Sequence, residues 1–158
     1  MRKIRNPFVN NENYKCFACS PNNENGLQME FYEDGDEVIS FWKPNEIFQG
    51  WGTILHGGIQ ATLMDEIAAW TVFVKLETAG VTTKIEASFK RPLILDGDKL
   101  VVKAVVKEVE NKTAKIHVRL YDSKEHQCTE GFIWYKIFSK EKAKVKLHYP
   151  CVEAFFDN

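Results

Sequence analysis

The run His-Gly-Gly-Ile-Gln-Ala-Thr-Leu-Met-Asp, residues 56–65, joins the expected start of a helix to a carboxylate about two turns further on. The first backbone N–H groups of a helix have no partner inside it and carry the positive end of the helix dipole, so they can hold a carbonyl oxygen. Gly57 and Gly58 lack the β-carbons that would keep a ligand away from these amides. With the carboxylate of Asp65, this spacing predicts chemistry on an activated carbonyl, such as a thioester.

The helix that carries Asp65 is predicted to run from about Gly58 to Leu76. Within residues 59–74 its only charged side chains are Asp65 and Glu66, which indicates a mostly buried helix. An apolar stripe suited to packing on a sheet is formed by Leu63, Ile67, Trp70 and Val74. An unpaired buried charge is costly, so Asp65 must face either a partner or a cavity. Spacing alone leaves a structural and a catalytic role for Asp65 equally open.

Length and composition limit the class of protein. With 158 residues, of which 44% are hydrophobic and 13% aromatic, the chain is expected to form one globular domain with a substantial core. Its 21 basic and 22 acidic residues nearly cancel, so neither nucleic acid nor an anionic membrane is an expected partner. Residues 1–15 contain no apolar run typical of a signal peptide or a membrane span, and we expect a cytoplasmic protein.

The four cysteines raise the question of a metal site. Cys16 and Cys19 form a Cys-x-x-Cys pair, and His148 and Cys151 form a second pair near the other end, so their number and spacing allow a zinc site that joins the two ends. The surrounding sequence has no βαβ or treble-clef pattern to support such a site. We therefore predict no metal and no other cofactor, and metal analysis of protein purified without chelator tests this expectation.

Strand-like patterns account for most of the remaining chain. They cover residues 27–33, 37–43, 81–90, 99–109, 113–121 and 127–138. The first two flank a Glu-Asp-Gly-Asp turn and predict a hairpin, and the last four are separated by short turns that predict an antiparallel meander. A single long helix inserted after the second strand is expected to cross the apolar face of the sheet. These features predict a two-layer α+β domain.

Several motifs in this order resemble those of hotdog-fold acyl-CoA thioesterases of the PaaI type, over residues 16–139. The motifs are His56-Gly57-Gly58 with Asp65, Cys16-Phe-Ala-Cys-Ser-Pro-Asn with Gly26-Leu27, Ser88-Phe-Lys-Arg-Pro92, and Gly97-Asp98. The resemblance implies an α+β hotdog fold, in which an antiparallel sheet of about six strands wraps around one long central helix. Residues 1–15 would then be an irregular N-terminal segment, and residues 140–158 a C-terminal extension of unknown role.

The resemblance also implies a reaction, the hydrolysis of an acyl-CoA to a carboxylic acid and CoA. Asp65 would act as general base or nucleophile, and the backbone N–H of Gly57 or Gly58 would polarise the thioester carbonyl. His56 would position the loop before the helix, a role that we favour over direct proton transfer.

Other residues are assigned to binding or positioning. The resemblance implies that a hydroxyl on the strand after the helix orients water, and either Thr82 or Thr83 has the right position. Gln49 lies in the loop before the helix and is a candidate for a polar contact with substrate. Lys90 and Arg91 end a strand beside a proline, and they are our first candidates for binding the CoA phosphates, although an ordinary solvated strand end explains them equally well.

Proteins of this type are dimers or tetramers whose sheets join edge to edge. The resemblance therefore implies a homodimer or homotetramer with the active site at the subunit interface, where Asp65 and Gly58 come from different subunits. The alternative is a non-catalytic acyl-CoA-binding hotdog protein, which would not need a carboxylate beside the carbonyl site. A hydratase would call for an Asp or His arrangement that this sequence lacks. The acyl group is not predicted, and a panel of acyl-CoAs assayed for free-thiol release would identify it.

Overall fold

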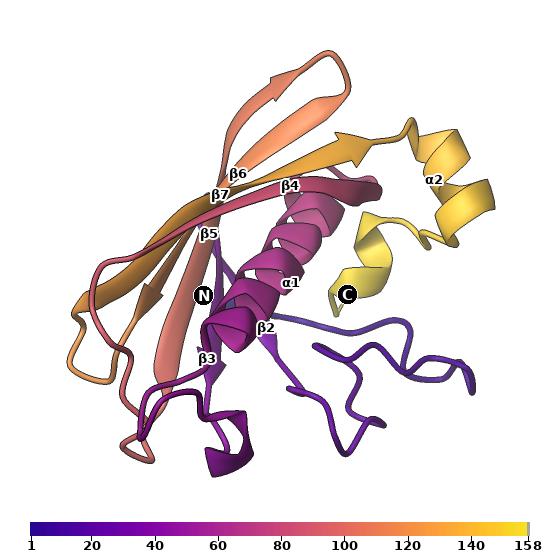
Figure 1. Ribbon diagram of the computed structural model, residues 1–158. Helices are drawn as coiled ribbons and strands as arrows, with labels where there is room; N and C mark the ends of the chain where they lie inside the picture. Colours follow the sequence, from indigo (N-terminus) through magenta and orange to yellow (C-terminus); the bar gives the residue numbers. More distant parts are fainter. Residues whose placement is uncertain (158) are drawn as a thin grey trace.

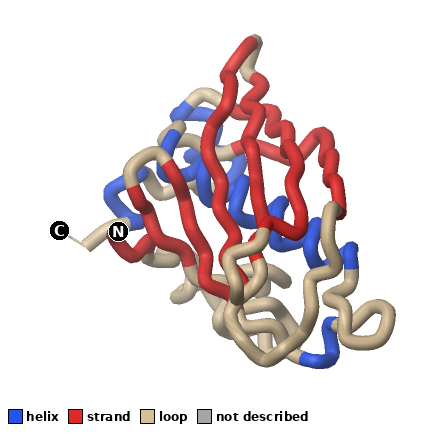
Figure 2. Tube along the Cα trace, turned by 90° about the vertical axis from the view of Figure 1, so that its left-hand side faces the viewer, coloured by secondary structure: helices blue, strands red, loops and turns tan. Residues whose placement is uncertain are grey.

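The computed structural model describes residues 1–157, which form a seven-stranded antiparallel sheet with one long helix across its face (Figure 1). The strands are β1 (Arg2–Ile4), β2 (Phe31–Asp34), β3 (Glu37–Trp42), β4 (Gly80–Phe89), β5 (Leu100–Glu110), β6 (Thr113–Tyr121) and β7 (Gln127–Ile137). The helices are α1 (Gly57–Lys75) and α2 (Lys140–Leu147), with 3₁₀ turns η1 (Glu46–Phe48) and η2 (Val152–Phe155). Seen from the side in Figure 2, the strands form one layer and α1 lies behind them. The predicted two-layer α+β architecture is confirmed.

The apolar stripe of α1 packs against the sheet as the sequence predicts. Leu63 and Ile67 are fully buried, and Trp70 is 1% exposed. On the opposing layer, alternate residues of β6 from Ala114 to Leu120 are fully buried, while the residues between them are partly exposed. The apolar face of the helix, with its 3.6-residue period, therefore packs against the apolar face of the strand, with its 2-residue period, in one core.

Gly131 of β7 lets α1 approach the sheet closely. A β-carbon at this position would lie 1.9 Å from the carbonyl oxygen of Glu86 and 2.7 Å from the Cε atom of Met64. A β-carbon here would require the backbone of β4 to move, so Gly131 allows β4 and β7 to pair closely beneath α1.

The order of the strands differs from the predicted meander. The sheet order is β1-β2-β3-β5-β6-β7-β4, so β4 pairs with β7 and not with β5. The reason is that α1 crosses the whole sheet and delivers the chain to its far edge, from which residues 90–99 return to the middle. As a consequence β4 is a ten-residue edge strand, and one of its sides has no partner strand among residues 1–157.

Both ends of the chain pack on the part of α1 that is far from its first turn. Residues 2–4 form strand β1, which three residues are too short to predict from periodicity, and the N–H of Arg5 donates to the carbonyl of Phe155, 2.8 Å away. The ring of Phe155 is fully buried and lies 5.7 Å from that of Trp70. Within residues 1–157, no helix combines the length and hydropathy that crossing a membrane requires.

Strand β2 begins four residues later than predicted because the preceding segment pairs with a loop. The N–H of Leu27 donates to the carbonyl of Phe17, and that of Met29 to the carbonyl of Ala18, at 2.8 and 2.9 Å. Residues 27–30 are therefore not a strand: Gln28 has a positive φ of 50°, and the hydrogen bonds of Leu27 and Met29 go to the Cys-x-x-Cys loop.

Candidate active site

The first turn of α1 is capped by the side chain of His56. Its Nδ1 atom accepts the N–H of Gly58 at 2.9 Å, and its carbonyl accepts the N–H of Gln60 at 3.0 Å. The two glycine amides predicted to hold a carbonyl therefore differ. The amide of Gly58 is already bonded, whereas no hydrogen bond of residues 1–157 uses the N–H of Gly57. Gly57 is thus the amide available to a ligand.

A hollow of about 360 Å³ opens beside this turn. It is lined by Ile47, Phe48, Gln49, His56, Gly58, Ile59 and Thr62. The loop before the helix can fold against His56 because a β-carbon at Gly50 would lie 3.1 Å from the Cα atom of His56, closer than a side chain tolerates easily. Gln49, predicted to contact substrate, lies in the wall of the hollow next to the helix start.

The carboxylate of Asp65 is held from the sheet side by two hydroxyl groups. Thr82 Oγ1 and the hydroxyl of Tyr135 both donate to Oδ1 of Asp65, each at 2.8 Å. The Tyr135 hydroxyl also lies 2.8 Å from the backbone carbonyl oxygen of Asp65. Within residues 1–157 the second carboxylate oxygen, Oδ2, accepts no hydrogen bond, and Asp65 is partly exposed. Asp65 is therefore oriented by Oδ1 and can take a proton on Oδ2.

Tyr135 is the site residue that the sequence analysis missed. Burial, together with the negative charge of Asp65, raises the pKa of Tyr135 above its usual range, so its hydroxyl remains a donor. The signal in the sequence is weak but physical. Tyr135 lies on the core-facing side of an alternating strand, and a buried tyrosine hydroxyl needs a partner.

A β-bulge distinguishes the two candidate threonines. The pairing of β4 with β7 shifts register between Thr82 and Lys84, so Thr83 has no opposite partner. Its hydroxyl donates to the carbonyl of Trp134 at 3.1 Å, while Thr82 reaches Asp65. Thr82 is therefore brought to the carboxylate and Thr83 is not.

Gly57 and Asp65 of one chain cannot act on the same carbonyl. They lie eight residues apart on one straight helix, which corresponds to about 12 Å along the axis. A carbonyl oxygen and the group that activates its attacker must lie within a few ångströms of the same carbon. Within one chain, the start of α1 at Gly57 and the position of Asp65 near its middle are therefore too far apart to contact one carbonyl together.

The two basic residues at the end of β4 differ in their surroundings. Lys90 pairs with Glu130, whose pKa is lowered by the hydrogen bonds from Lys90 and from His117. Arg91 is exposed and forms no ion pair within residues 1–157. The backbone N–H groups of both residues donate to the carbonyl of Cys128, at 2.8 and 3.1 Å, which fixes the strand end. Arg91 is the one whose charge is available to an anion.

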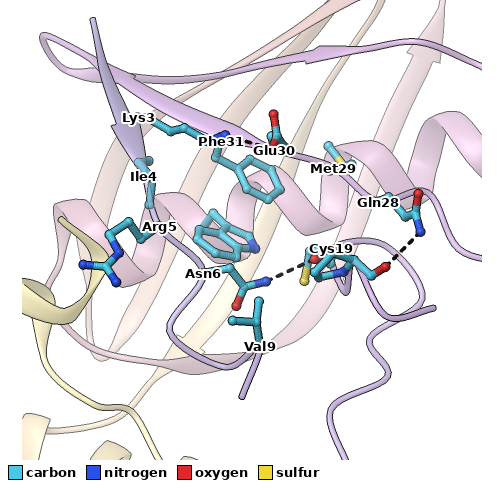
Figure 3. A pocket seen from close by; sticks show the side chains of 12 residues that line it. Lys3, Ile4, Arg5, Asn6, Val9, Cys19, Gln28, Met29, Glu30 and Phe31 are labelled. Carbon is cyan, nitrogen blue, oxygen red and sulfur yellow. Dashed lines mark hydrogen bonds and ion pairs between the residues drawn. The ribbon is translucent and has the colours of Figure 1, made fainter. Parts of the chain in front are cut away.

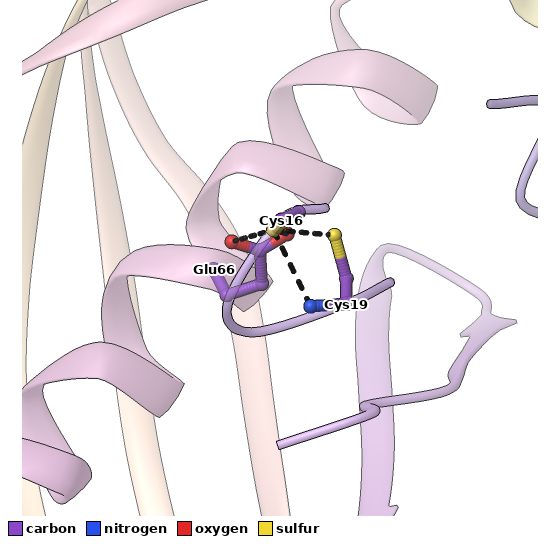
Figure 4. Close-up of side chains that lie close together, drawn as sticks. All are labelled: Cys16, Cys19 and Glu66. Carbon is purple, nitrogen blue, oxygen red and sulfur yellow. Dashed lines mark hydrogen bonds between the residues drawn. The ribbon is translucent and has the colours of Figure 1, made fainter. Parts of the chain in front are cut away.

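The structure places the candidate metal ligands in a different combination from the one that the sequence allowed. Cys16 and Cys19 lie beside Glu66 of α1, with one potential ligand atom from each within 4.8 Å of the others (Figure 4). Among residues 1–157, His148 and Cys151 do not join this group. The hydrogen bond from the thiol of Cys19 lowers the pKa of Cys16 to about 6, and burial, with the charge of Cys16, raises the pKa of Glu66 to about 7.

We predict that His56 acts on stability through its cap. The His56→Ala variant is expected to lose about 1 kcal/mol of unfolding free energy, because Gly58 N–H loses its acceptor. His56→Asn should recover most of this loss, since Asn is a good N-cap residue. Denaturant unfolding of the three proteins measures the effect. Equal stability of the Ala variant and the parent protein would contradict the capping role.

Comparisons with known proteins agree with the fold. Residues 52–129 match the family model of the thioesterase superfamily. A search of curated protein sequences gave no significant match. Similar solved structures include a thioesterase superfamily protein, with 18% identity and a TM-score of 0.68 over 77% of this chain and 62% of that one. This chain thus spans less than two-thirds of that protein.

Two further structures add to this result. PaaI from the phenylacetic acid degradation operon of E. coli is 16% identical, with a TM-score of 0.64 over 72% of this chain and 82% of PaaI. A Streptococcus mutans protein bound to acetyl-CoA is 17% identical, with a TM-score of 0.64 over 71% of this chain and 90% of that one. The hotdog fold and the resemblance to thioesterases of this superfamily are confirmed.

Proposed function

We propose that this protein, whose residues 52–129 match the family model of the thioesterase superfamily, hydrolyses an acyl-CoA to a carboxylic acid and CoA. The observation that carries the proposal is the carboxylate of Asp65, with two hydroxyl donors on Oδ1 and none within residues 1–157 on Oδ2. A positioned general base needs a fixed carboxylate with one oxygen open to a water molecule, and Asp65 meets both conditions.

In the proposed reaction, Asp65 Oδ2 takes a proton from a water molecule as the water oxygen attacks the thioester carbon. The carbonyl oxygen gains negative charge and is held by the N–H of Gly57, the unbonded amide at the positive end of α1. The tetrahedral intermediate then expels the CoA thiolate, which takes up the proton from Asp65. Thr82 and Tyr135 keep the carboxylate oriented throughout. Direct attack by Asp65 is the alternative. It expels CoA thiolate and forms a mixed anhydride, and where water then attacks the aspartyl carbon of this anhydride, ¹⁸O from labelled water enters the Asp65 side chain in a single turnover.

The site is proposed to form between two subunits. The separation of about 12 Å between Gly57 and Asp65 of one chain supports this arrangement, since in the proposed reaction both groups must reach one carbonyl. The unpaired edge of β4 offers the surface, because Val81, Ile85 and Phe89 are 44%, 42% and 55% exposed there. The ring of Phe89, at the end of β4, lies close to Gly57: a β-carbon added to Gly57 would be 3.5 Å from it. Edge-to-edge pairing would extend one sheet through both subunits.

The phosphates of CoA are proposed to contact Arg91, with Lys90 beside it. Arg91 is exposed and unpaired within residues 1–157, and guanidinium groups bind phosphate through two parallel hydrogen bonds. A similar fold in a protein bound to acetyl-CoA supports this class of ligand.

The experiment that tests the proposed function is a panel of acyl-CoAs with short, long, branched and aromatic acyl groups. Release of free thiol is followed with a thiol reagent, and carboxylic acid is confirmed by mass spectrometry. We expect the protein to hydrolyse at least one acyl-CoA of the panel, and we expect this activity to be lost when Asp65 is replaced. Tight binding of an acyl-CoA with no thiol release would instead identify the protein as an acyl-CoA binder.

We predict that a charge on the β4 edge abolishes both assembly and activity. Ile85→Glu places a carboxylate where two copies of β4 would meet, so the protein should elute as a monomer and lose turnover. Val145→Glu, on the 77% exposed side chain of α2, is the matched control and should change neither property. Light scattering after size exclusion, with the same assay, checks this. A monomeric parent protein with full activity would contradict the shared site.

A further inference from the structure

We propose that Cys16, Cys19 and Glu66 bind a Zn²⁺ ion that fastens the N-terminal loop to α1. The Sγ atom of Cys16 lies 3.0 Å from that of Cys19 and 3.7 Å from each carboxylate oxygen of Glu66 (Figure 4). Two thiolates and a carboxylate are donors that zinc accepts in a tetrahedral site. The loop and the helix residue are 50 positions apart in the chain, so the cluster is a product of the fold.

The Cys-x-x-Cys loop is built in a way that suits thiolate ligands. The backbone N–H of Cys19 points at Sγ of Cys16, 3.3 Å away, and such a bond stabilises the charged sulfur that metals require. Pairing of Phe17 and Ala18 with residues 27–29 holds the loop from its other side. Both sulfurs are therefore fixed before any ion arrives, which lowers the entropy cost of binding.

Glu66 completes the donor set from the helix. Its Oε1 atom accepts a hydrogen bond from Nε1 of Trp70 at 2.9 Å, which orients the carboxylate toward the loop. No lysine, arginine or histidine of residues 1–157 forms an ion pair with it. An acidic group enclosed by two sulfurs and an indole lacks a positive partner, and a divalent cation supplies one.

A cavity reaches the proposed site from the side of Cys19. A cavity of about 480 Å³ is lined by Cys19 and Trp70, and it opens between β1 and the loop (Figure 3). The Tyr14 hydroxyl lies 2.7 Å from Sγ of Cys19. At hydrogen-bond distance this hydroxyl can donate to the Cys19 sulfur, and the fourth position of a tetrahedral ion would be left to water. A proposed metal site needs such an entry path.

This site is distinct from the carboxylate that performs hydrolysis. Asp65 is bonded to Thr82 and Tyr135 on the sheet, while Glu66, one residue later, faces the N-terminal loop. The ion would hold the loop against the middle of the helix that carries Asp65. Its role is structural, and its presence does not depend on the proposed reaction.

The test uses the full chain without an affinity tag, purified in reducing buffer without chelator. We expect about one zinc per chain by elemental analysis. After removal of zinc, titration with Co²⁺ should produce intense near-ultraviolet absorption from thiolate ligands and visible bands of a tetrahedral ion. Cys16→Ser and Glu66→Gln should each weaken Co²⁺ binding about tenfold or more. Cys151→Ser is the matched control and should leave the spectrum unchanged.

The wild-type Co²⁺ titration decides the proposal even if a variant fails to fold. A reduced wild-type protein that holds no zinc and gives no thiolate absorption with Co²⁺ would overturn it. So would a protein isolated with a Cys16–Cys19 disulfide that stays metal-free after reduction. Loss of the spectrum in Cys151→Ser would move the site to the two chain ends. None of these measurements uses acyl-CoA, so the metal proposal can be tested even if the protein does not hydrolyse acyl-CoA.

Discussion

Replacing Asp65 by Asn is expected to lower kcat for a responsive acyl-CoA by about a hundredfold or more, because a positioned general base contributes at least that factor. Asn has nearly the same shape as Asp, and its carbonyl oxygen can still accept the hydroxyls of Thr82 and Tyr135 at the place of Oδ1. Its amide nitrogen takes the place of Oδ2 and cannot accept a proton from water. The variant therefore removes the base and keeps the packing.

In the Asp65→Asn variant, kcat should fall while KM and the thermal stability stay close to those of the parent protein. We expect KM to change little, since Asp65 is proposed to act on the attacking water and not on bound CoA. Thermal unfolding should lie close to that of the parent protein. Asp36→Asn, in the exposed turn between β2 and β3, is the control for loss of one carboxylate. Undiminished kcat in Asp65→Asn would rule out both the base and the nucleophile assignments.

The sequence was sufficient for the long helix, for the longer strands and for the position of the carboxylate on that helix. The apolar stripe through Leu63 and Ile67 predicted α1 to within one residue at each end, because a helix buried against a sheet must show that period. The strict alternation in residues 113–121 predicted β6 for the same kind of reason. Local periodicity reports which face is buried, and these two elements have one buried face each.

Contacts between distant segments could not be read in the same way. The cap on Gly58 depends on the rotamer of His56, so two adjacent glycines were indistinguishable until the hydrogen bond was seen. The meeting of Glu66 with the Cys-x-x-Cys loop depends on how residues 27–29 pair with that loop. The edge position of β4 depends on the direction in which α1 crosses the sheet. Each is set by chain topology, which leaves no periodic trace in the sequence.

The second large effect on kcat is expected from removing the backbone N–H of residue 57. Gly57 is the first residue of α1, the helical position at which proline is best tolerated, and His56 before it has the extended angles, φ −55° and ψ 132°, that proline requires of its predecessor. Gly57→Pro therefore deletes the proposed oxyanion donor while the helix start remains intact. Loss of a single such donor lowers kcat by about a hundredfold to a thousandfold.

The matched control is Gly57→Ala, which adds a β-carbon at an ordinary 3.5 Å from the Phe89 ring and keeps the N–H. It should retain most of the turnover that Gly57→Pro loses. Equal losses in the two variants would show that bulk at this position, and not the missing hydrogen, lowers the rate. Similar melting temperatures of the two proteins would confirm that the comparison concerns chemistry.

Mixing the two inactive proteins tests whether Gly57 and Asp65 of different subunits share one site. In a dimer of one Gly57→Pro chain and one Asp65→Asn chain, one site carries both changes and the other carries neither. Random assortment of equal amounts should therefore restore about a quarter of the parent activity, because half of the dimers are mixed and each has one intact site. The two chains are co-expressed with different tags, and the mixed dimer isolated through both tags should reach about half of the parent activity, because one of its two sites is intact. Activity that stays at the level of the separate variants would contradict the shared site. It would also require Gly57 and Asp65 of one chain to reach the same carbonyl across about 12 Å of helix.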